Sequence, residues 1–107
     1  MSNSGGSLKW NAIREIAAGS LTNSYQDLGG VFLQDAFRLW FTNNTNGDAY
    51  FSNDGFTNMI KMPAYTGRAY DNKTNDAFCK AGTQWQVKFD AVPGSPVGWI
   101  TLEVEFV

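Results

Sequence analysis

The chain has 107 residues, of which 43% are hydrophobic, 15% aromatic and 17% charged, and its formal net charge is −2. This length supports one domain with a single core, and the low charge content with many Asn, Gly, Ser and Thr residues is typical of a short-stranded β protein. Eight scattered Lys and Arg residues form no basic stripe for nucleic acid, and no run of about 18 apolar residues is present for a membrane span.

The N-terminal segment differs in composition from the rest of the chain. Residues 1–7, Met-Ser-Asn-Ser-Gly-Gly-Ser, predict a flexible arm that a partner orders, and residues 8–107 predict a single β-sandwich domain. The arm lacks the basic and apolar regions of a signal peptide, so we expect synthesis in the cytoplasm. From Leu8 to Leu21 the apolar residues fit either a helix or a strand, and we favour a strand.

The strongest turn signal is Asn46-Gly47. Alternating residues in Ala36–Thr42 precede it, and the apolar stretch Ala49–Ser52 follows it. Both Asn and Gly accept positive φ, which matches the twist of two paired strands. The sequence therefore predicts a β-hairpin here, after a less regular stretch over residues 22–36 with a turn at Gly29-Gly30.

Further strands are expected over residues 58–62, 67–71, 76–80 and 84–90, and Pro63 ends the first of them. In Gly98–Phe106 the apolar residues Ile100, Leu102, Val104 and Phe106 alternate with Thr101, Glu103 and Glu105. A period of two predicts a strand with one buried and one solvated face. About seven or eight short strands at intervals near ten residues predict an all-β, antiparallel sandwich or jelly-roll-like domain.

The residue types exclude several kinds of catalytic site. The chain has no histidine and a single cysteine, Cys79, so it has no Ser-His or Cys-His pair, no His- or Cys-rich zinc site and no intrachain disulfide. Cys79 is expected to be a buried apolar residue. We therefore expect no catalytic residue, no cofactor and no metal ion.

Two groups of oxygen-bearing side chains could in principle carry chemistry. Glu103 and Glu105 lie two apart on one strand face, a spacing that overlaps glycosidase geometry, but the solvated face of a strand is the favoured interpretation. Asn44, Asn46 and Asp48 resemble the start of a calcium loop. The twelfth position, which such a loop fills with a bidentate acid, is Gly55, so an ordinary turn is favoured.

The aromatic residues offer the clearest candidates for binding. Four tryptophans and four tyrosines could form stacking platforms for sugars or bases: Trp10, Trp40, Trp85, Trp99, Tyr25, Tyr50, Tyr65 and Tyr70. Trp85 alternates with Val87 and Phe89 and is expected in the core. In their strands, Trp40 and Trp99 lie on the face opposite to the alternating apolar residues. This position predicts a second buried face or a subunit contact. We favour the subunit contact, and Ser2, Asn3 and Ser4 of the arm are further interface candidates.

Several segments resemble small structural proteins in the virions of tailed bacteriophages. They are Trp10-Asn-Ala-Ile-Arg-Glu-Ile-Ala-Ala-Gly-Ser20, Tyr25-Gln-Asp-Leu-Gly29, Phe51-Ser-Asn-Asp-Gly55, Met62-Pro-Ala64 and Phe78-Cys-Lys-Ala-Gly-Thr-Gln-Trp-Gln-Val87. The resemblance implies a β-sandwich virion component without cofactor or active site: a head decoration protein, a neck or tail adaptor or connector, or a fibre anchor. It implies binding to capsid, neck, tail or fibre subunits in a symmetric homo-oligomeric assembly.

A second hypothesis belongs to a different class. In a carbohydrate-binding module, exposed tryptophans stack on sugar rings while Asn and Asp side chains in loops bond to hydroxyl groups. Trp40 and Trp99 would supply the stacking surface in that case. Glycan-dependent quenching of tryptophan fluorescence discriminates this module from a virion component.

Overall fold

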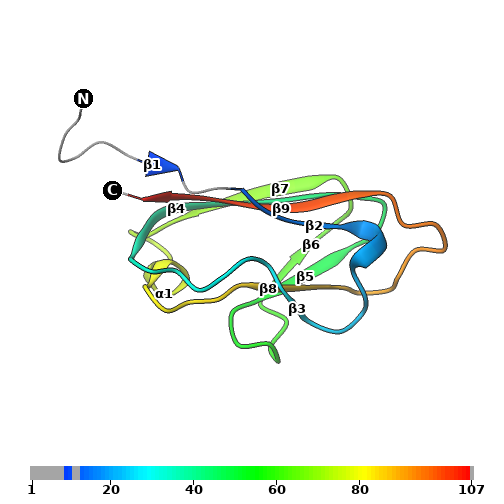
Figure 1. Ribbon diagram of the computed structural model, residues 1–107, viewed down its shortest axis with the longest axis horizontal. Helices are drawn as coiled ribbons and strands as arrows, with labels where there is room; N and C mark the ends of the chain where they lie inside the picture. The colour runs from blue at the N-terminus through cyan, green and yellow to red at the C-terminus, as the bar shows by residue number, and fades with distance from the viewer. Residues whose placement is uncertain (1–8, 11–12, 107) are drawn as a thin grey trace.

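A computed structural model describes residues 9–10 and 13–106 of the chain, and the predicted arm over residues 1–7 lies outside this part (Figure 1). The described chain forms two antiparallel sheets packed face to face, with a 3₁₀ turn and one short helix. The strands are β1 Lys9–Trp10, β2 Arg14–Ala17, β3 Gln26–Asp27, β4 Ala36–Thr45, β5 Ala49–Ser52, β6 Ile60–Met62, β7 Thr66–Asp71, β8 Gln86–Phe89 and β9 Gly98–Phe106. The 3₁₀ turn η1 is Ala18–Ser20, and the helix α1 is Asp76–Cys79.

Each sheet is four strands wide. Sheet A has the order β1-β9-β4-β7, with β2 also paired to β9, and sheet B has the order β3-β8-β5-β6. Because β4 occupies one side of β9 along its whole length, β1 and β2 follow one another along its other side as one interrupted strand. Figure 1 shows sheet A above and sheet B below. The predicted antiparallel sandwich of seven or eight strands is confirmed.

Aromatic side chains from both sheets form the centre of the core. The Phe41 ring of β4 lies 4.8 Å from the Phe51 ring of β5 and 4.9 Å from the Trp85 ring, both edge to face. Trp85 is fully buried, as predicted, and so are Ile100 and Leu102 of β9. Burying an aromatic or large aliphatic side chain contributes about 1.5–3 kcal/mol, so these facing residues are the main force that holds the two sheets together.

The predicted hairpin at Asn46-Gly47 is wrong. β4 pairs with β7 and β9 in sheet A, whereas β5 pairs with β6 and β8 in sheet B. The turn after β4 therefore carries the chain from one sheet to the other and does not join two paired strands. β4 also continues to Thr45, three residues beyond the predicted strand.

A buried asparagine accounts for this crossing. The Asn43 side-chain amide donates hydrogen bonds to the carbonyl oxygens of Gly47 at 2.9 Å and Met62 at 3.0 Å. The Asn43 Oδ1 accepts hydrogen bonds from the Thr45 amide and hydroxyl. These side-chain bonds satisfy the backbone groups of the turn from inside the molecule. Hydrogen bonds between β4 and β5 are therefore not required to satisfy them.

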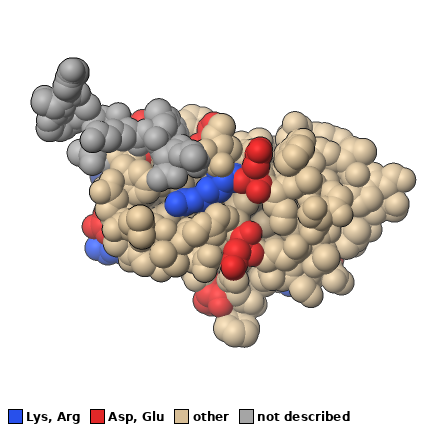
Figure 2. All heavy atoms as spheres, in the orientation of Figure 1, with Lys and Arg blue, Asp and Glu red and all other residues tan. Residues whose placement is uncertain are grey.

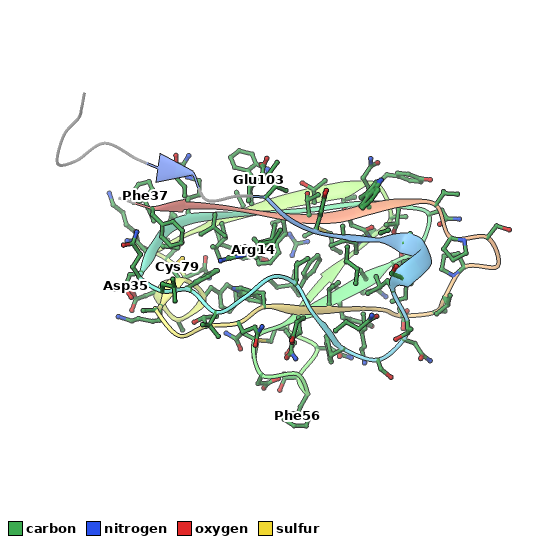
Figure 3. All side chains as sticks on the ribbon, in the orientation of Figure 1. Arg14, Asp35, Phe37, Phe56, Cys79 and Glu103 are labelled. Carbon is green, nitrogen blue, oxygen red and sulfur yellow. The ribbon has the colours of Figure 1, made fainter. Side chains whose placement is uncertain are left out.

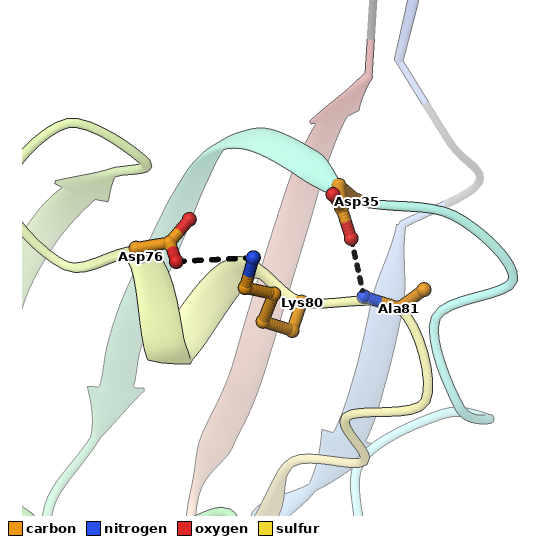
Figure 4. A network of polar contacts seen from close by, with 4 residues as sticks. All are labelled: Asp35, Asp76, Lys80 and Ala81. Atoms are coloured by element: carbon orange, nitrogen blue, oxygen red, sulfur yellow. Dashed lines mark hydrogen bonds and ion pairs between the residues drawn. The ribbon is translucent and has the colours of Figure 1, made fainter.

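The strand predicted over residues 76–80 is also wrong, because this segment forms α1. Phe78 packs its ring 5.0 Å from Trp85, and the adjacent Cys79 is buried. Two neighbouring residues can both face the core in a helical turn, whereas a strand sends them to opposite sides. Figure 4 shows how the segment is held: Asp76 pairs with Lys80 at 3.1 Å, and the Asp35 carboxylate accepts a hydrogen bond from the Ala81 amide at 2.8 Å.

Candidate functional site

Trp40 and Trp99 both lie on the face of sheet A that points away from sheet B, and we call this the outer face. Trp40 of β4 lies in register with Glu103 of β9 on one side and Ala69 of β7 on the other. Its side chain is 42% exposed. The period of two along β4 therefore places Trp40 outward while Leu39 and Phe41 enter the core.

Trp99 lies on the same face. It is in register with Asn44 of β4 and with Ala17 of β2, and it is 50% exposed. The rows of Trp40 and Trp99 lie four positions apart along β4, which is about 13 Å along a strand. Thr42 and Thr101 form the paired row between them. Two half-exposed indoles on a rigid sheet, with small polar residues between them, make a surface suited to stacking or to protein contact.

The predicted positions of Trp40 and Trp99 are thus confirmed, while their role in a subunit interface stays a prediction. The first of the two alternatives, a second buried face, does not describe these exposed side chains. The other interface candidates, Ser2, Asn3 and Ser4, lie outside the residues that the structure describes.

Glu105 is not on a solvated face, so that part of the prediction for β9 is wrong. It is only 5% exposed, and its Oε1 lies 3.7 Å from Nη1 of Arg38. Strands flank it on both sides, since Glu105 is in register with Trp10 of β1 and with Arg38 of β4. The enclosed Glu105 carboxylate balances the charge of Arg38. Glu103, in the row of Trp40, is partly exposed to solvent.

The remaining polar candidates have structural partners. The Asn46 amide donates to the Ser95 carbonyl, and the Asn46 Oδ1 accepts from the Val97 amide. The Asp48 Oδ1 accepts from the Ala64 amide at 3.0 Å. These side chains hold loops together, as the turn interpretation of the Asn44–Asp48 segment implies. Within the described ranges, no group of three or more Cys, Asp or Glu residues could hold a metal ion.

Cys79 is buried, as predicted. Burial raises the pKa of its thiol to about 11, with further contributions from Asp71, Asp76 and Asp35. The thiolate is the reactive form of cysteine. A thiol with this pKa is almost entirely protonated near neutral pH, so Cys79 acts as a small core residue.

The loop over residues 53–58 presents a feature that the sequence did not reveal. The Asp54 Oδ1 accepts hydrogen bonds from the Phe56 amide at 2.7 Å and the Thr57 amide at 2.8 Å, and Ser52 Oγ donates to it at 2.8 Å. These bonds lower the pKa of the Asp54 carboxyl below its ordinary value. The loop holds Phe56 outward, 89% exposed, at the tip that Figure 3 labels. The residue types of Asn53-Asp54-Gly55 are typical of a turn, but nothing in the sequence marks Phe56 as its apex.

Charged side chains are sparse on the side of the molecule that Figure 2 shows, where most of the surface belongs to uncharged residues. No helix in the described part of the chain is long and apolar enough to cross a membrane. No family model, curated protein or solved structure matches this chain. The outer face, with its two half-exposed tryptophans, is the candidate functional site.

Proposed function

We propose that this chain is a non-enzymatic structural component of a tailed-phage virion, and that it binds capsid, neck or tail subunits through the outer face of sheet A. The observation that carries this proposal is the pair Trp40 and Trp99, half exposed on the outer face of the sandwich. Tryptophan is among the residues most enriched in the centres of protein interfaces. An exposed apolar patch on a sheet is a common site of association.

The neighbourhood of the tryptophans combines uncharged and charged residues. Thr42, Thr101 and Ala69 are uncharged, whereas Glu103 in the row of Trp40 and Glu15, in register with Thr101, are acidic. A partner that covers this face must therefore supply polar or basic groups that replace the water around these two carboxylates. The backbone of a central strand pair is already ordered, so binding adds little loss of conformational entropy.

The virion class rests on the resemblance of the segments over residues 10–87, and the antiparallel sandwich is the fold that this resemblance implies. Virion components of this kind act in symmetric assemblies, where weak contacts sum over many copies. We therefore propose a homo-oligomer, with further contacts to other virion subunits. Synthesis takes place in the host cytoplasm, and the mature location is the particle.

Light scattering of the purified protein tests the assembly part of this proposal. We expect a discrete oligomer for the unaltered chain and a lower mass for the Trp40→Ala/Trp99→Ala double variant. Phe56→Ala is the comparison, because Phe56 is the most exposed aromatic side chain outside the outer face. We expect this variant to keep the oligomer.

Either of two results would contradict the proposal. An oligomer that Phe56→Ala disperses and the double tryptophan variant preserves would move the interface to the 53–58 loop. A monomer that binds no component of tailed particles, in pull-downs with purified capsids and tails, would remove the virion role. Peptides of this chain in purified particles of a phage that encodes it, detected by mass spectrometry, support the proposed location directly.

A carbohydrate-binding module is the second candidate, and one observation favours it. Trp40 and Trp99 share a flat face with the hydroxyl groups of Thr42 and Thr101 and the amide of Asn44, which could bond to sugar hydroxyls. This function predicts saturable quenching of tryptophan fluorescence by a glycan, lost in the double tryptophan variant. A flat response across a broad glycan panel leaves the assembly role as the better account.

A further inference from the structure

A cavity of about 370 Å³ opens between β2 and the loop that precedes β4. Its lining combines two polar side chains, Arg14 and Gln34, with three apolar ones, Val31, Leu33 and Phe106. Leu33 is 91% exposed and stands at the rim, while Phe106 is buried. Figure 3 shows Arg14 between the two sheets, on the side of the molecule that faces the viewer.

Neighbouring residues fix the position of the Arg14 side chain. Arg14 is in register with Leu102 of β9, so it projects toward the interior of the sandwich. Its guanidinium carbon lies 4.7 Å from the centre of the Phe32 ring. The Phe32 backbone is fixed by hydrogen bonds to Thr83 at 2.8 Å and from Gly82 at 2.7 Å. A side-chain carbon at Gly29, which has a φ of +77°, would collide with Arg14.

Among the described residues, no acidic side chain pairs with Arg14. Its Nη1 is buried and has no acceptor within hydrogen-bonding distance among the described residues. The ion pairs in this part of the chain are Arg38 with Glu105 and Lys80 with Asp76. Burial lowers the pKa of Arg14.

Arg14 is partly buried, and its Nη1 loses water without gaining a hydrogen-bond acceptor among the described residues. Such a loss is costly, and a bound anion relieves the cost. The planar fork of arginine matches the two oxygens of a carboxylate. Gln34 supplies a further N–H donor at the same cavity. The apolar walls formed by Val31, Leu33 and Phe106 leave room beside the carboxylate for an aliphatic or aromatic group.

From this geometry we infer that the cavity is a binding site for a carboxylate that carries an apolar group, with Arg14 as its anchor. Two sources share this chemistry: a free carboxylic acid, and an Asp or Glu side chain next to apolar residues in a peptide segment of a partner. The inference does not depend on the proposed function, because the cavity lies between the sheets and the two tryptophans lie on the outer face of sheet A.

Titration followed by ¹H–¹⁵N NMR tests this site with two probes. Sodium hexanoate represents the free acid, and acetyl-Leu-Glu-Leu-amide represents the peptide. Hexan-1-ol and the Gln version of the peptide are the uncharged controls. We expect saturable shifts of the Val31 and Leu33 amides with at least one charged probe, and at least tenfold weaker binding of its control. The probe that binds identifies the source.

Arg68 provides a matched control for Arg14. Arg14 on β2 is in register with Leu102, Arg68 on β7 is in register with Phe41, and Leu102 and Phe41 are themselves paired, so the two arginines occupy the two ends of one row across sheet A. We expect Arg14→Gln to weaken binding at least tenfold and Arg68→Gln to change it less than twofold. The NMR spectrum and the melting temperature of each variant establish that it is folded.

Leu33→Glu keeps the site testable if Arg14→Gln fails to fold. Its exposed position tolerates a polar residue, and a carboxylate at the rim would repel or displace the probe. We expect at least tenfold weaker binding. The inference is overturned if neither charged probe produces a saturable shift, or if a folded Arg14→Gln or Leu33→Glu variant binds as well as the unaltered protein.

Discussion

Gly98, the first residue of β9, lies directly against the backbone carbonyl of Asn44 in β4. A side-chain carbon at Gly98 would overlap this carbonyl oxygen, and the φ of Gly98 is +95°. Both the close approach and the backbone conformation require glycine. The long strand pair at the centre of sheet A depends on this contact, because Gly98 and Thr45 are the last paired residues of β9 and β4 at this end.

The substitution Gly98→Ala is expected to destabilise the fold by about 2 kcal/mol or more. The new Cβ would push β9 away from β4 and place alanine in a strained conformation. Gly94→Ala is the matched control, because a Cβ at Gly94 meets no atom within 4 Å. Urea unfolding followed by circular dichroism measures the difference, and equal midpoints for the two variants would contradict the proposed contact.

Asn43→Ala should cost about 2–3 kcal/mol. It would remove the Asn43 donor from the buried carbonyl groups of Gly47 and Met62, of which the Gly47 carbonyl keeps the Thr45 hydroxyl as a second donor. Asn44→Ala is the control, since Asn44 is the next residue and its side chain is exposed. We expect its free energy of unfolding to stay within about 0.5 kcal/mol of that of the unaltered protein. Chemical unfolding of both variants tests whether the buried amide stabilises the crossing between the sheets.

Asp54 predicts a pH dependence of stability. Its folded-state pKa lies below the ordinary aspartate value of about 4, so the carboxylate stabilises the fold above that pH. This contribution is lost as the pH falls through the folded-state pKa. Asp54→Asn should therefore lower the melting temperature at pH 7 and have less effect near pH 2.

Thermal melts over this pH range test the prediction. The unaltered protein, melted over the same pH range, is the reference for this comparison. A constant gap between Asp54→Asn and the unaltered protein at every pH would argue against a role of the charge.

The Cys79 thiol should resist modification in the folded protein. It is buried and has a pKa of about 11, so at pH 8 it presents little thiolate and little access. We expect its reaction with a thiol reagent to accelerate at least a hundredfold in denaturant. Ser95→Cys in the Cys79→Ser background places a thiol in an exposed loop and should react at the rapid rate while folded. Rapid modification of native Cys79 would show that α1 opens easily.

The parts of the fold that the sequence predicts well are those in which burial alternates along the strand. In β9, and in β8 with the residue before it, the period of two decides which side each residue faces. Trp85, Ile100 and Leu102 could therefore be assigned to the core and Trp99 to the outer face. The exposed positions of Trp40 and Trp99 follow from the same rule. The central residues of the candidate site were therefore available from the sequence.

The sequence-based predictions are wrong where a residue's environment depends on partners that are distant in the chain. Asn46-Gly47 is a local turn signal, and it contains no information about which sheet the next strand joins; that depends on the buried Asn43. Alternation suggested solvent for Glu105, but β1 lies beside it. The cavity around Arg14 required knowledge of the segment that packs across it, which no local pattern provides.

The order of strands in sheet A has a consequence for how the chain folds. β9 joins the two ends of the sequence, because residues 98–106 pair with β1 and β2 on one side and with β4 on the other. During synthesis β4 can pair with β7, but the other edge of β4 stays open until β9 emerges. Sheets that depend on such distant pairing fold slowly and expose strands to aggregation in the interval. A nascent chain halted before residue 98 should therefore be an effective chaperone substrate.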